Sequence, residues 1–401
     1  MNSAWHIVTG EYPPVEGGVG DYVFALANEL SQLGDEVHVW CPSNAGQGLD
    51  QPGVQIHPEF GRFRPGDCRR VGRQLTNESH SRRLLVQWVP QTFGLRGANL
   101  PFCLWILWRS IASRDVVELM VHEPFLRIGG SLKQRAAAVA QRLMVAALIM
   151  SSSRVWVSTP YWWALLRPFA FGRRVNAGWL PLPSNVPLEA DPNRIAEIRS
   201  EVADSTRVVG HFGLFGPGKD AYLIPFVEAI LDRVPEVAVR LVGVGSTKTR
   251  QSVVACRPDL GPRLIAVDGV QKDEAVCNLA ACDLLVQPYV DGISTRRTSA
   301  MAGLALGVAT VTHSGESTET LWRESQAVVL AGPTPDDYAE AVAAVFGDPV
   351  LRTQLSERAS DLYQKRFHIR YVIERLRSPI DTARPAVDEA LLDISLDQGV
   401  S

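Results

Sequence analysis

The sequence predicts an α/β protein with two domains, each a doubly wound parallel sheet with helices on both faces. Short apolar segments alternate with amphipathic helical segments in two successive series, an alternation typical of parallel sheets. The 401 residues exceed the roughly 100 to 200 residues of one ordinary domain, which favours two. Residues 181–187, between the two series, contain three prolines and predict a linker, because proline fits neither a helix interior nor a central strand.

We therefore expect a first domain over residues 1–187, a second over residues 188–377 and a loose tail over residues 378–401. The final helices of the second domain can pack back on the first. The strands expected in the first domain are residues 5–8, 37–40, 84–88, 116–121 and 155–158. Those expected in the second are residues 207–212, 237–242, 263–267, 284–287 and 308–312. Ligands of such sheets bind beyond the ends of the strands, so the loops there are the first candidates for a site.

The composition is that of a globular protein without a nucleic-acid partner. Hydrophobic residues make up 46% and charged residues 21%, and the formal net charge of −3 gives no overall basic field. The six cysteines are dispersed, without a Cys-x-x-Cys pair or a Cys/His cluster at zinc spacing, and the sequence has no Asp-x-Asp motif. We expect a small-molecule ligand and no metal.

Nothing in the sequence predicts export or a membrane span. Residues 1–9 lack a basic segment followed by a long apolar run, so no secretory signal is expected. The most apolar stretch, residues 136–150, is interrupted by Gln141 and Arg142 and falls short of the roughly 20 residues that a span requires. We expect a cytoplasmic protein.

A glycine-rich loop lies between the first expected strand and the first helix. Residues 11–21 have the sequence EYPPVEGGVGD, in which Gly17 and Gly18 precede the helix. Glycines let backbone N–H groups approach a ligand, and the amino end of a helix favours a phosphate. The loop therefore predicts a diphosphate or sugar site, and its alternative is an ordinary turn. The nicotinamide-binding pattern Gly-x-Gly-x-x-Gly is not satisfied, which argues against a dehydrogenase.

Further loops of this kind follow strands of the second domain. Gly213 leads into Gly216-Pro217-Gly218-Lys219, and the segment 243–246 has the sequence GVGS. Residues 268–270 are Asp268, Gly269 and Val270, and the next expected strand is followed by the sequence DGISTRRTS over residues 291–299. Each loop taken alone is explained by a plain turn, but all of them lie where strands end.

In their order and spacing, these motifs resemble those of the retaining GT-B glycosyltransferases of group 1, the family that includes sucrose synthases and bacterial mannosyltransferases. The resemblance covers about residues 5–376, with a poor match over residues 44–114. It implies the GT-B architecture, two Rossmann-like domains facing across a cleft. It also implies a hexosyltransferase that moves a sugar from a nucleotide-sugar to a saccharide, lipid-linked or small-molecule acceptor, with retention of anomeric configuration and without a metal or other cofactor.

The resemblance assigns three catalytic residues. His122 follows the strand 116–121 and matches the family histidine that faces the donor sugar, and its alternative is a structural hydrogen-bonding role. Lys219 matches the lysine that contacts the donor diphosphate, and Asp291 matches the first acid of a paired-acid motif. The donor-binding residues that the resemblance implies are Gly17, Gly18, Gly213, Asp268, Gly269, Val270, Gly292, Ile293 and Ser294, with Ser299 at the position of the ribose-binding acid.

The chain departs from the family pattern at two positions on the nucleotide side. Leu214 aligns with the arginine that accompanies the lysine, and Ser299 replaces the second acid. Arg296 and Arg297 are candidate replacement cations, because guanidinium groups bind phosphate oxygens in bidentate fashion. Their alternative is a solvated pair. These departures motivate a second hypothesis, a catalytically inactive GT-B scaffold that acts as a nucleotide- or sugar-binding or regulatory subunit.

The acceptor is expected to bind the first domain, where seven arginines lie between residues 62 and 83 and an aromatic run covers residues 102–108. The arginines are Arg62, Arg64, Arg69, Arg70, Arg73, Arg82 and Arg83. They suit a phosphorylated acceptor, or a peripheral contact with the inner face of a membrane into which the aromatic run inserts. The alternative is a solvated basic loop beside a buried helix.

Overall fold

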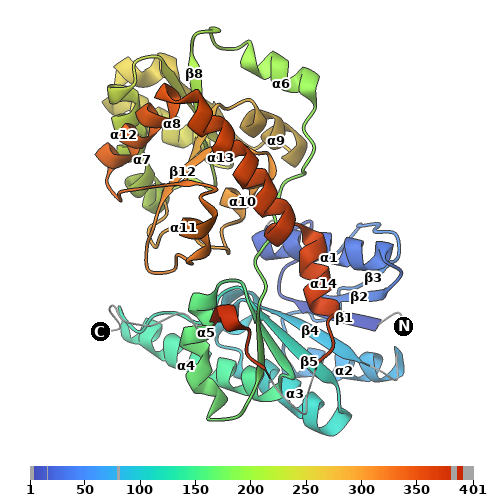
Figure 1. Cartoon of the computed structure of the whole chain (residues 1–401). Helices are drawn as coiled ribbons and strands as arrows, with labels where there is room; N and C mark the ends of the chain where they lie inside the picture. Colours follow the sequence, from blue (N-terminus) through green and yellow to red (C-terminus); the bar gives the residue numbers. More distant parts are fainter. Residues whose placement is uncertain (1–3, 16, 79–81, 381–385, 392–401) are drawn as a thin grey trace. The chain divides into compact units, whose positions relative to one another are not determined.

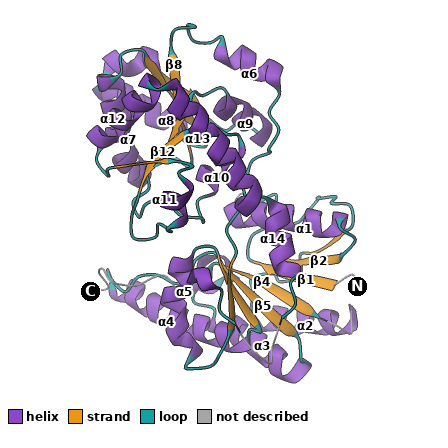
Figure 2. Cartoon of the chain, viewed as in Figure 1, coloured by secondary structure: helices purple, strands orange, loops and turns teal. Residues whose placement is uncertain are grey.

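The computed structural model describes residues 4–15, 17–78, 82–380 and 386–391. The chain forms two compact units, one of Met1–Pro181 with Ile369–Ser401 and one of Leu182–His368 (Figure 1). Each unit is a parallel sheet with helices packed on its faces (Figure 2). The predicted fold class, two doubly wound Rossmann-like domains, is confirmed.

The sheet of the first unit has seven parallel strands in the order β3-β2-β1-β4-β5-β6-β7. The strands are β1 (Ala4–Thr9), β2 (Glu36–Trp40), β3 (Val54–His57), β4 (Arg83–Trp88), β5 (Val116–Val121), β6 (Arg154–Val157) and β7 (Asn176–Trp179). The helices are α1 (Gly18–Gln32), α2 (Pro65–Glu78), α3 (Leu100–Trp108), α4 (Leu132–Ser151), α5 (Pro160–Leu166) and α14 (Ile369–Arg377). Short helical turns are η1 (Pro90–Thr92), η2 (Leu95–Gly97), η3 (Arg109–Ser113), η4 (Arg167–Ala170) and η7 (Glu389–Leu391).

The second unit has six parallel strands in the order β10-β9-β8-β11-β12-β13. The strands are β8 (Arg207–Phe212), β9 (Val237–Val242), β10 (Leu264–Val267), β11 (Leu284–Val286), β12 (Thr310–His313) and β13 (Val329–Ala331). The helices and turns are α6 (Pro192–Arg199), α7 (Pro217–Arg233), α8 (Ser246–Cys256), η5 (Pro258–Arg263), α9 (Lys272–Ala280), α10 (Thr298–Ala305), α11 (Leu321–Ser325), α12 (Pro335–Gly347), α13 (Pro349–Leu362) and η6 (Tyr363–Phe367).

All ten expected strands are present, with ends that differ by one or two residues. Most of their residues are buried, which is why they stand out as mostly apolar runs. Three observed strands are not among the expected ones: β3, β7 and β13. Each has only three or four residues, and β7 contains Asn176 and Gly178, so no apolar run marks it.

The unit boundary lies six residues before the expected one, and the prolines do not form a free linker. The backbone N–H of Leu182 donates to the carbonyl of Thr295 (3.0 Å), and the N–H of Ser184 donates to the hydroxyl of Tyr363 (3.2 Å). Residues 182–187 are therefore tied to the second unit. Helix α14 belongs to the first unit, where it packs against α1 and where Arg377 Nη2 pairs with Asp35 Oδ1 (2.8 Å).

The described part of the expected tail is docked rather than loose. Val387 forms a parallel bridge with Ala177 of β7, and Leu391 is buried in the core of the first unit. The side chain of Asp388 also pairs with Arg375. Residues 386–391 are therefore held against β7 by a single bridge and by side-chain contacts. The rest of the expected tail, residues 381–385 and 392–401, lies outside the described residues.

A buried ion cluster joins the beginning of β5 to its neighbours in the first unit. Both carboxylate oxygens of Asp115 are bonded, one to Arg82 Nε (2.6 Å) and the other to Arg109 Nε. The side chain of Arg109 is only 1% exposed, so its charge depends on this carboxylate. Removing one partner of a buried pair leaves an uncompensated charge, which is strongly destabilising.

The substitution Asp115→Ala is expected to lower the free energy of unfolding of the first unit by about 3 to 5 kcal/mol. Urea titration followed by tryptophan fluorescence tests this, because nine of the ten tryptophans lie in the first unit. The control Arg70→Ala removes a surface pair with Asp67 in the same unit and is expected to cost less than about 1 kcal/mol. Equal effects of the two substitutions would contradict the role of the buried cluster.

Candidate functional site

Both sheets place the predicted loops where doubly wound sheets bind ligands. In the second unit the strand order runs outward in both directions from β8 and β11, so this pair marks the topological switch point. Gly213 lies in the β8 loop, which leads to Lys219 in the first turn of α7. Asp291 lies in the β11 loop, which leads to Ser299 in the first turn of α10. In the first unit the corresponding pair is β1 and β4, and the β1 loop contains Gly17 and Gly18.

The turns after β8 and β9 approach each other so closely that only glycine fits. An added Cβ at Gly243, whose φ is +133°, would lie 1.9 Å from the carbonyl oxygen of Gly213. The β8 loop is held from its other side by Asp220, which accepts the N–H of Gly216 (2.9 Å) and the hydroxyl of Thr249 (2.9 Å). Lys219 lies in the first turn of α7 and is exposed. This lysine is therefore displayed at the edge of the sheet by a rigid loop.

The predicted catalytic acid and the two predicted replacement cations form one ion cluster, which we call the Asp291 clamp. Arg296 Nη2 lies 2.5 Å from Asp291 Oδ2, and Arg297 Nη2 bonds Oδ1. The hydroxyl of Ser317 also donates to Asp291 Oδ2 (3.1 Å). Burial raises the pKa of Asp291, but Arg297 and Arg296 outweigh it and hold the pKa below its usual range. The clamp thus contains an ionised carboxylate and carries one net positive charge.

The backbone after Asp291 is fixed by close packing. An added Cβ at Gly292, whose φ is +78°, would lie 2.1 Å from the nitrogen of Gly315, so only glycine fits there. Ile293 is fully buried in the core, and its N–H donates to the carbonyl of His313 (3.0 Å). Ser294 is also buried, and its hydroxyl has no hydrogen-bond partner among the described residues. Ile293 is therefore a packing residue, and Ser294 has a free hydroxyl beside the clamp.

Tyr289 is not among the predicted site residues, although it bonds one of them. Its hydroxyl shares a hydrogen bond with the hydroxyl of Ser299 (2.8 Å), and the guanidinium of Arg297 lies 4.7 Å from the centre of its ring. Burial raises the pKa of Tyr289 to about 12, so the hydroxyl stays protonated. Ser299, which was predicted to stand in place of a ribose-binding acid, thus forms a neutral pair with Tyr289. The only sequence signal for Tyr289 is its place just after β11.

Asp268, in the predicted donor-binding segment 268–270, caps a helix. The carboxylate of Asp268 accepts the N–H of Gly245 (2.8 Å) and the N–H of Thr247 (3.1 Å), which lie at the amino end of α8. These bonds, the one from Gly245 foremost, lower the pKa of Asp268. Gly269 has a φ of +64°, and Val270 packs against the core of the unit. The carboxylate of Asp268 is therefore already engaged by the protein.

Two buried histidines near these loops are absent from the predicted set. His211 of β8 donates its Nδ1–H to the carbonyl of Val286 (2.9 Å), and burial lowers its pKa to about 4. His313 of β12 bonds the hydroxyl of Tyr338 through Nδ1 (2.8 Å), and burial lowers its pKa as well. Both histidines are neutral at pH 7. They lie at strand ends, which is the signal that would have identified them.

In the first unit, the amino end of α1 is occupied by a carboxylate. An added Cβ at Gly17 would lie 2.3 Å from Oε2 of Glu11, so the glutamate side chain lies directly over this glycine. Burial raises the pKa of Glu11, and a hydrogen bond from the backbone of Gly20 opposes that effect. Among the described residues, no atom lies within 4 Å of a Cβ added at Gly18. Glu11 thus lies where a donor phosphate was expected, and a neutral sugar suits this loop better.

His122 lies in a group of buried polar side chains at the carboxyl edge of the first sheet. Its Nε2–H donates to Oε1 of Gln87 (2.8 Å), and its ring meets the ring of Tyr22 edge-on, with 5.2 Å between the centres. Burial lowers the pKa of His122 to about 3, so the ring is neutral. Three atoms of this group lack a hydrogen-bond partner among the described residues: His122 Nδ1, Gln87 Nε2 and Tyr22 Oη.

Of these unpartnered atoms, His122 Nδ1 can accept a hydrogen bond, Gln87 Nε2 can donate, and the Tyr22 hydroxyl can do both. Each buried polar atom without a partner costs roughly 1 to 3 kcal/mol, so such atoms are usually satisfied by water or by a ligand. A sugar presents hydroxyl groups that both donate and accept. The His122 group therefore has the chemistry of a polyol-binding site.

The comparisons with known proteins identify the fold. No protein-family model and no curated protein has a significant match to the chain. Among solved structures, HepE of Anabaena in complex with UDP is similar with a TM-score of 0.69 and 15% identity, over 93% of this chain and 98% of that chain. Sucrose-phosphate synthase from Thermosynechococcus elongatus gives a TM-score of 0.68 and 15% identity, over 94% and 97%.

A third similar structure is WaaG, a glycosyltransferase involved in lipopolysaccharide biosynthesis, with a TM-score of 0.61 and 12% identity over 93% of this chain and 98% of that chain. At these identities the similarity establishes the fold alone. The chain has the GT-B fold, and the fold expected from the sequence motifs is confirmed.

The burial of His122 predicts a dependence of stability on pH. Its pKa is about 3 in the folded chain and 6.5 when unfolded, so its contribution is present above pH 6.5 and is lost as the pH falls from 6.5 toward 3. In His122→Gln, the loss of stability between pH 6.5 and about pH 5 should be smaller by roughly 2 kcal/mol. Urea titrations followed by tryptophan fluorescence at the two pH values measure this difference. Equal losses of stability in the wild type and in His122→Gln would show that burial does not lower the pKa of His122.

Proposed function

We propose that the chain is a glycosyltransferase that moves a hexosyl group from a nucleotide-sugar to an acceptor with retention of anomeric configuration. The observation that supports this most is the Asp291 clamp, which holds two guanidinium groups at the switch point of the second sheet. Similar folds support the donor class, since HepE of Anabaena was solved with UDP and with UDP-glucose.

The donor diphosphate is proposed to bind at the β8 and β11 loops. The clamp has one net positive charge, and arginine binds phosphate oxygens in bidentate fashion. Lys219 adds a second positive charge, and the amino end of α7 offers backbone N–H groups beside it. A diphosphate that leaves a sugar gains negative charge, and each aligned donor typically lowers the barrier by about 3 to 4 kcal/mol.

Asp291 is proposed to hold the two arginines when no donor is bound, to compete with the diphosphate for them, and to accept a hydrogen bond from a donor-sugar hydroxyl. The Tyr289–Ser299 pair replaces a charged ribose contact with neutral hydroxyl groups, which makes that contact weaker. The ribose is therefore proposed to contribute less to donor binding than the diphosphate does.

The His122 group is proposed to bind sugar hydroxyls. His122 Nδ1 accepts a hydroxyl proton, while Tyr22 and Gln87 donate to hydroxyl oxygens. A neutral imidazole suits this role, since it keeps a lone pair at pH 7.

Retention is proposed to arise from attack on the face that the diphosphate leaves. The bond between the anomeric carbon and the phosphate oxygen breaks, and the acceptor oxygen bonds the same carbon. The leaving phosphate oxygen takes the acceptor proton, so no protein side chain is needed as the base. The acceptor is proposed to be a saccharide, a lipid-linked sugar or a small molecule.

Lys219→Ala is expected to lower kcat/KM for donor turnover by about a hundredfold or more, because one cation at the leaving group is lost. Release of nucleoside diphosphate from a panel of nucleotide-sugars and acceptors measures the turnover. The control Lys365→Ala removes an exposed lysine of η6 and should leave the rate unchanged. Unchanged turnover in Lys219→Ala would exclude the proposed diphosphate site.

The inactive scaffold remains a second candidate, and specific observations favour it. Leu214 is 62% exposed where the family has an arginine, and Ser299 replaces an acid. Glu11 also covers the amino end of α1. If nucleoside diphosphates raise the melting temperature and no donor in the panel is turned over, the scaffold function replaces the enzymatic one.

Cationic side chains, rather than a divalent ion, are proposed to neutralise the leaving diphosphate. Turnover is therefore expected to be unchanged within about twofold when EDTA is present, because Arg296, Arg297 and Lys219 supply the charge. The assay compares EDTA-treated protein with the same protein after Mg²⁺ or Mn²⁺ is added. Loss of turnover in EDTA that either ion restores would contradict the proposal.

A further inference from the structure

A second surface of the first unit exposes apolar side chains along two adjacent helices, α3 and α4, which pack side by side. On α3 and the turn η3, the exposed residues are Leu104, Trp108 and Ile111, at positions i, i+4 and i+7. On α4 they are Leu132, Val139, Leu143 and Met150, at positions i, i+7, i+11 and i+18. Both spacings place the side chains on one side of a helix. We call these seven residues the apolar face.

The core does not require the apolar face. The opposite sides of the two helices already supply buried residues, among them Phe102 and Ile106 of α3 and Met144 and Leu148 of α4. Ile111 is 72% exposed and Leu132 is 82% exposed. Contiguous exposed apolar surface of this kind marks contact with a partner or a membrane.

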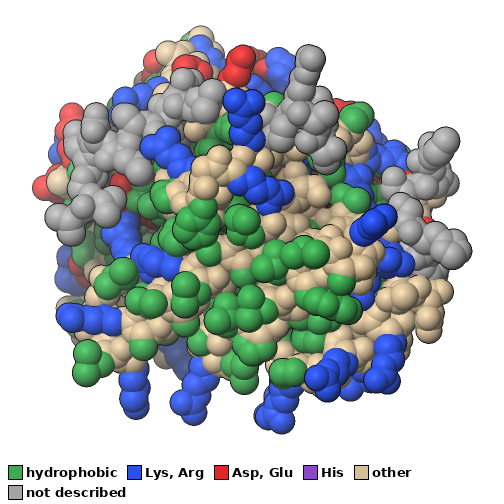
Figure 3. Space-filling model, turned by 90° about the horizontal axis from the view of Figure 1, so that it is seen from below, with side chains coloured by type: hydrophobic (Ala, Val, Ile, Leu, Met, Phe, Trp, Pro, Cys, Tyr) green, Lys and Arg blue, Asp and Glu red, His purple; other side chains and the backbone are tan. Residues whose placement is uncertain are grey.

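The surrounding sequence is strongly basic, in contrast to the chain as a whole. Residues 79–188 contain thirteen Lys or Arg and three Asp or Glu, whereas the whole chain has a net charge of −3. Two of these three acids, Asp115 and Glu118, are buried in pairs with arginines. Seen from below, hydrophobic side chains lie across the molecule and Lys and Arg surround them (Figure 3). The face therefore suits an anionic partner.

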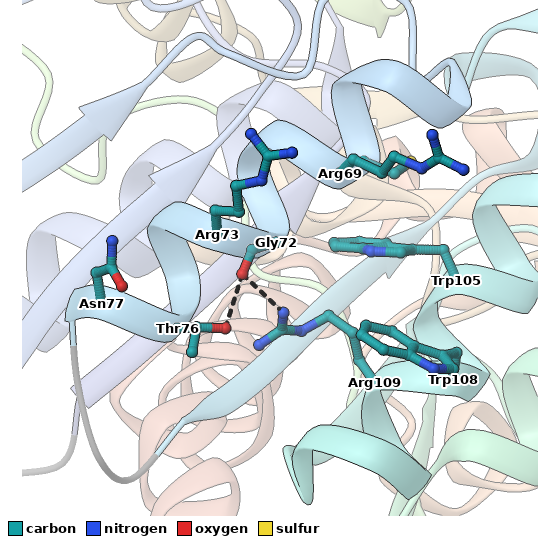
Figure 4. Close-up of a pocket in the computed structure, with 9 residues that line it drawn as sticks. Arg69, Gly72, Arg73, Thr76, Asn77, Trp105, Trp108 and Arg109 are labelled. Carbon is teal, nitrogen blue, oxygen red and sulfur yellow. Dashed lines mark hydrogen bonds between the residues drawn. The ribbon is translucent and has the colours of Figure 1, made fainter.

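A pocket of about 650 Å³ lies beside the apolar face, between α2 and α3 (Figure 4). It is lined by Arg69, Arg73, Trp105, Trp108 and Arg109, among others. Arg109 is buried, and although its Nη1 donates to the carbonyl of Gly72 (3.0 Å), its Nη2 has no partner among the described residues. A buried guanidinium N–H without an acceptor favours an anion, and a phosphate oxygen is a fitting one.

We propose that the apolar face docks the protein on the surface of an anionic lipid bilayer, with a lipid phosphate in the α2–α3 pocket. Apolar side chains then enter the interface, tryptophans lie at headgroup depth, and the arginines contact the negative surface. No helix among the described residues is long and apolar enough to cross a membrane, so the proposed contact is with the surface. A second copy of the chain fits this face poorly, because a two-fold contact would bring two basic surfaces together.

This proposal does not rest on the proposed function, since lipid binding is measured without donor turnover. Phosphatidylcholine vesicles with and without phosphatidylglycerol are sedimented with the full chain at about 0.1 M and about 0.5 M salt. We expect at least tenfold stronger binding to the anionic vesicles, weakened at the higher salt.

Two double variants separate the contribution of the arginines from that of the apolar side chains. Arg69→Ala with Arg73→Ala is expected to weaken binding to anionic vesicles about thirtyfold, since each arginine near such a surface contributes about fivefold. Trp108→Ser with Ile111→Ser is expected to weaken it about tenfold or more through lost apolar contact. The controls Arg233→Ala and Val350→Ser change exposed residues of the second unit and should bind like the wild type. Melting curves check that each variant is folded.

Several outcomes would overturn the proposal. They are no binding to anionic vesicles, equal binding to both kinds of vesicle, or unchanged binding by both double variants. A dimer that forms in solution and is lost in the Trp108→Ser and Ile111→Ser variant would also overturn it, because a second copy would then cover the face. Sedimentation equilibrium without lipid tests that outcome.

Discussion

The ion cluster of Asp291 with Arg296 and Arg297 determines the chemistry of the second unit's carboxyl edge. One carboxylate neutralises one guanidinium, so the cluster keeps a single positive charge and a fixed geometry. That geometry depends on glycine at position 292, where an added Cβ would lie only 2.1 Å from the nitrogen of Gly315. The close packing of Gly292 against Gly315 therefore fixes the backbone of the loop that carries the cluster.

The two sheet edges have opposite electrostatic character. The edge of the second unit presents the clamp and Lys219, which suit an anion. The edge of the first unit presents neutral His122 and the carboxylate of Glu11, which suit hydroxyl groups and disfavour a phosphate. The proposed function assigns the anionic diphosphate to the edge that suits an anion and sugar hydroxyl groups to the edge that suits hydroxyl groups.

The sequence predicts the fold well because both sheets are buried and parallel. Strands such as β5, β8 and β9 are mostly apolar, and Gly243 and Gly292 mark turns that only glycine allows. Short strands such as β7, and the docking of residues 386–391 beside it, depend on contacts between distant segments and leave no local pattern. Leu214 and Ser299, by contrast, are departures that the sequence alone reveals.

The hydrogen-bond and ion-pair partners of the site residues were harder to predict from the sequence than the positions of these residues in the fold. The sequence places Arg296 and Arg297 near a diphosphate, but their bonds to Asp291 depend on how the loop folds. Asp268 was predicted to bind the donor, yet its carboxylate caps α8. Gly17 was also predicted to bind the donor, yet the side chain of Glu11 covers it. Tyr289 follows β11 and Ser299 lies in the first turn of α10. Their spacing in the sequence does not encode the contact between their hydroxyl groups.

The central claim is that the clamp arginines bind the donor diphosphate in competition with Asp291. Isothermal titration of a nucleoside diphosphate into the wild type, Asp291→Asn and Arg297→Ala tests it most directly. The account predicts tighter binding in Asp291→Asn, by about fivefold or more, because a competing charge is removed, and weaker binding in Arg297→Ala. Weaker binding in both variants would show that Asp291 organises the site without competing, and unchanged binding in both would contradict the account.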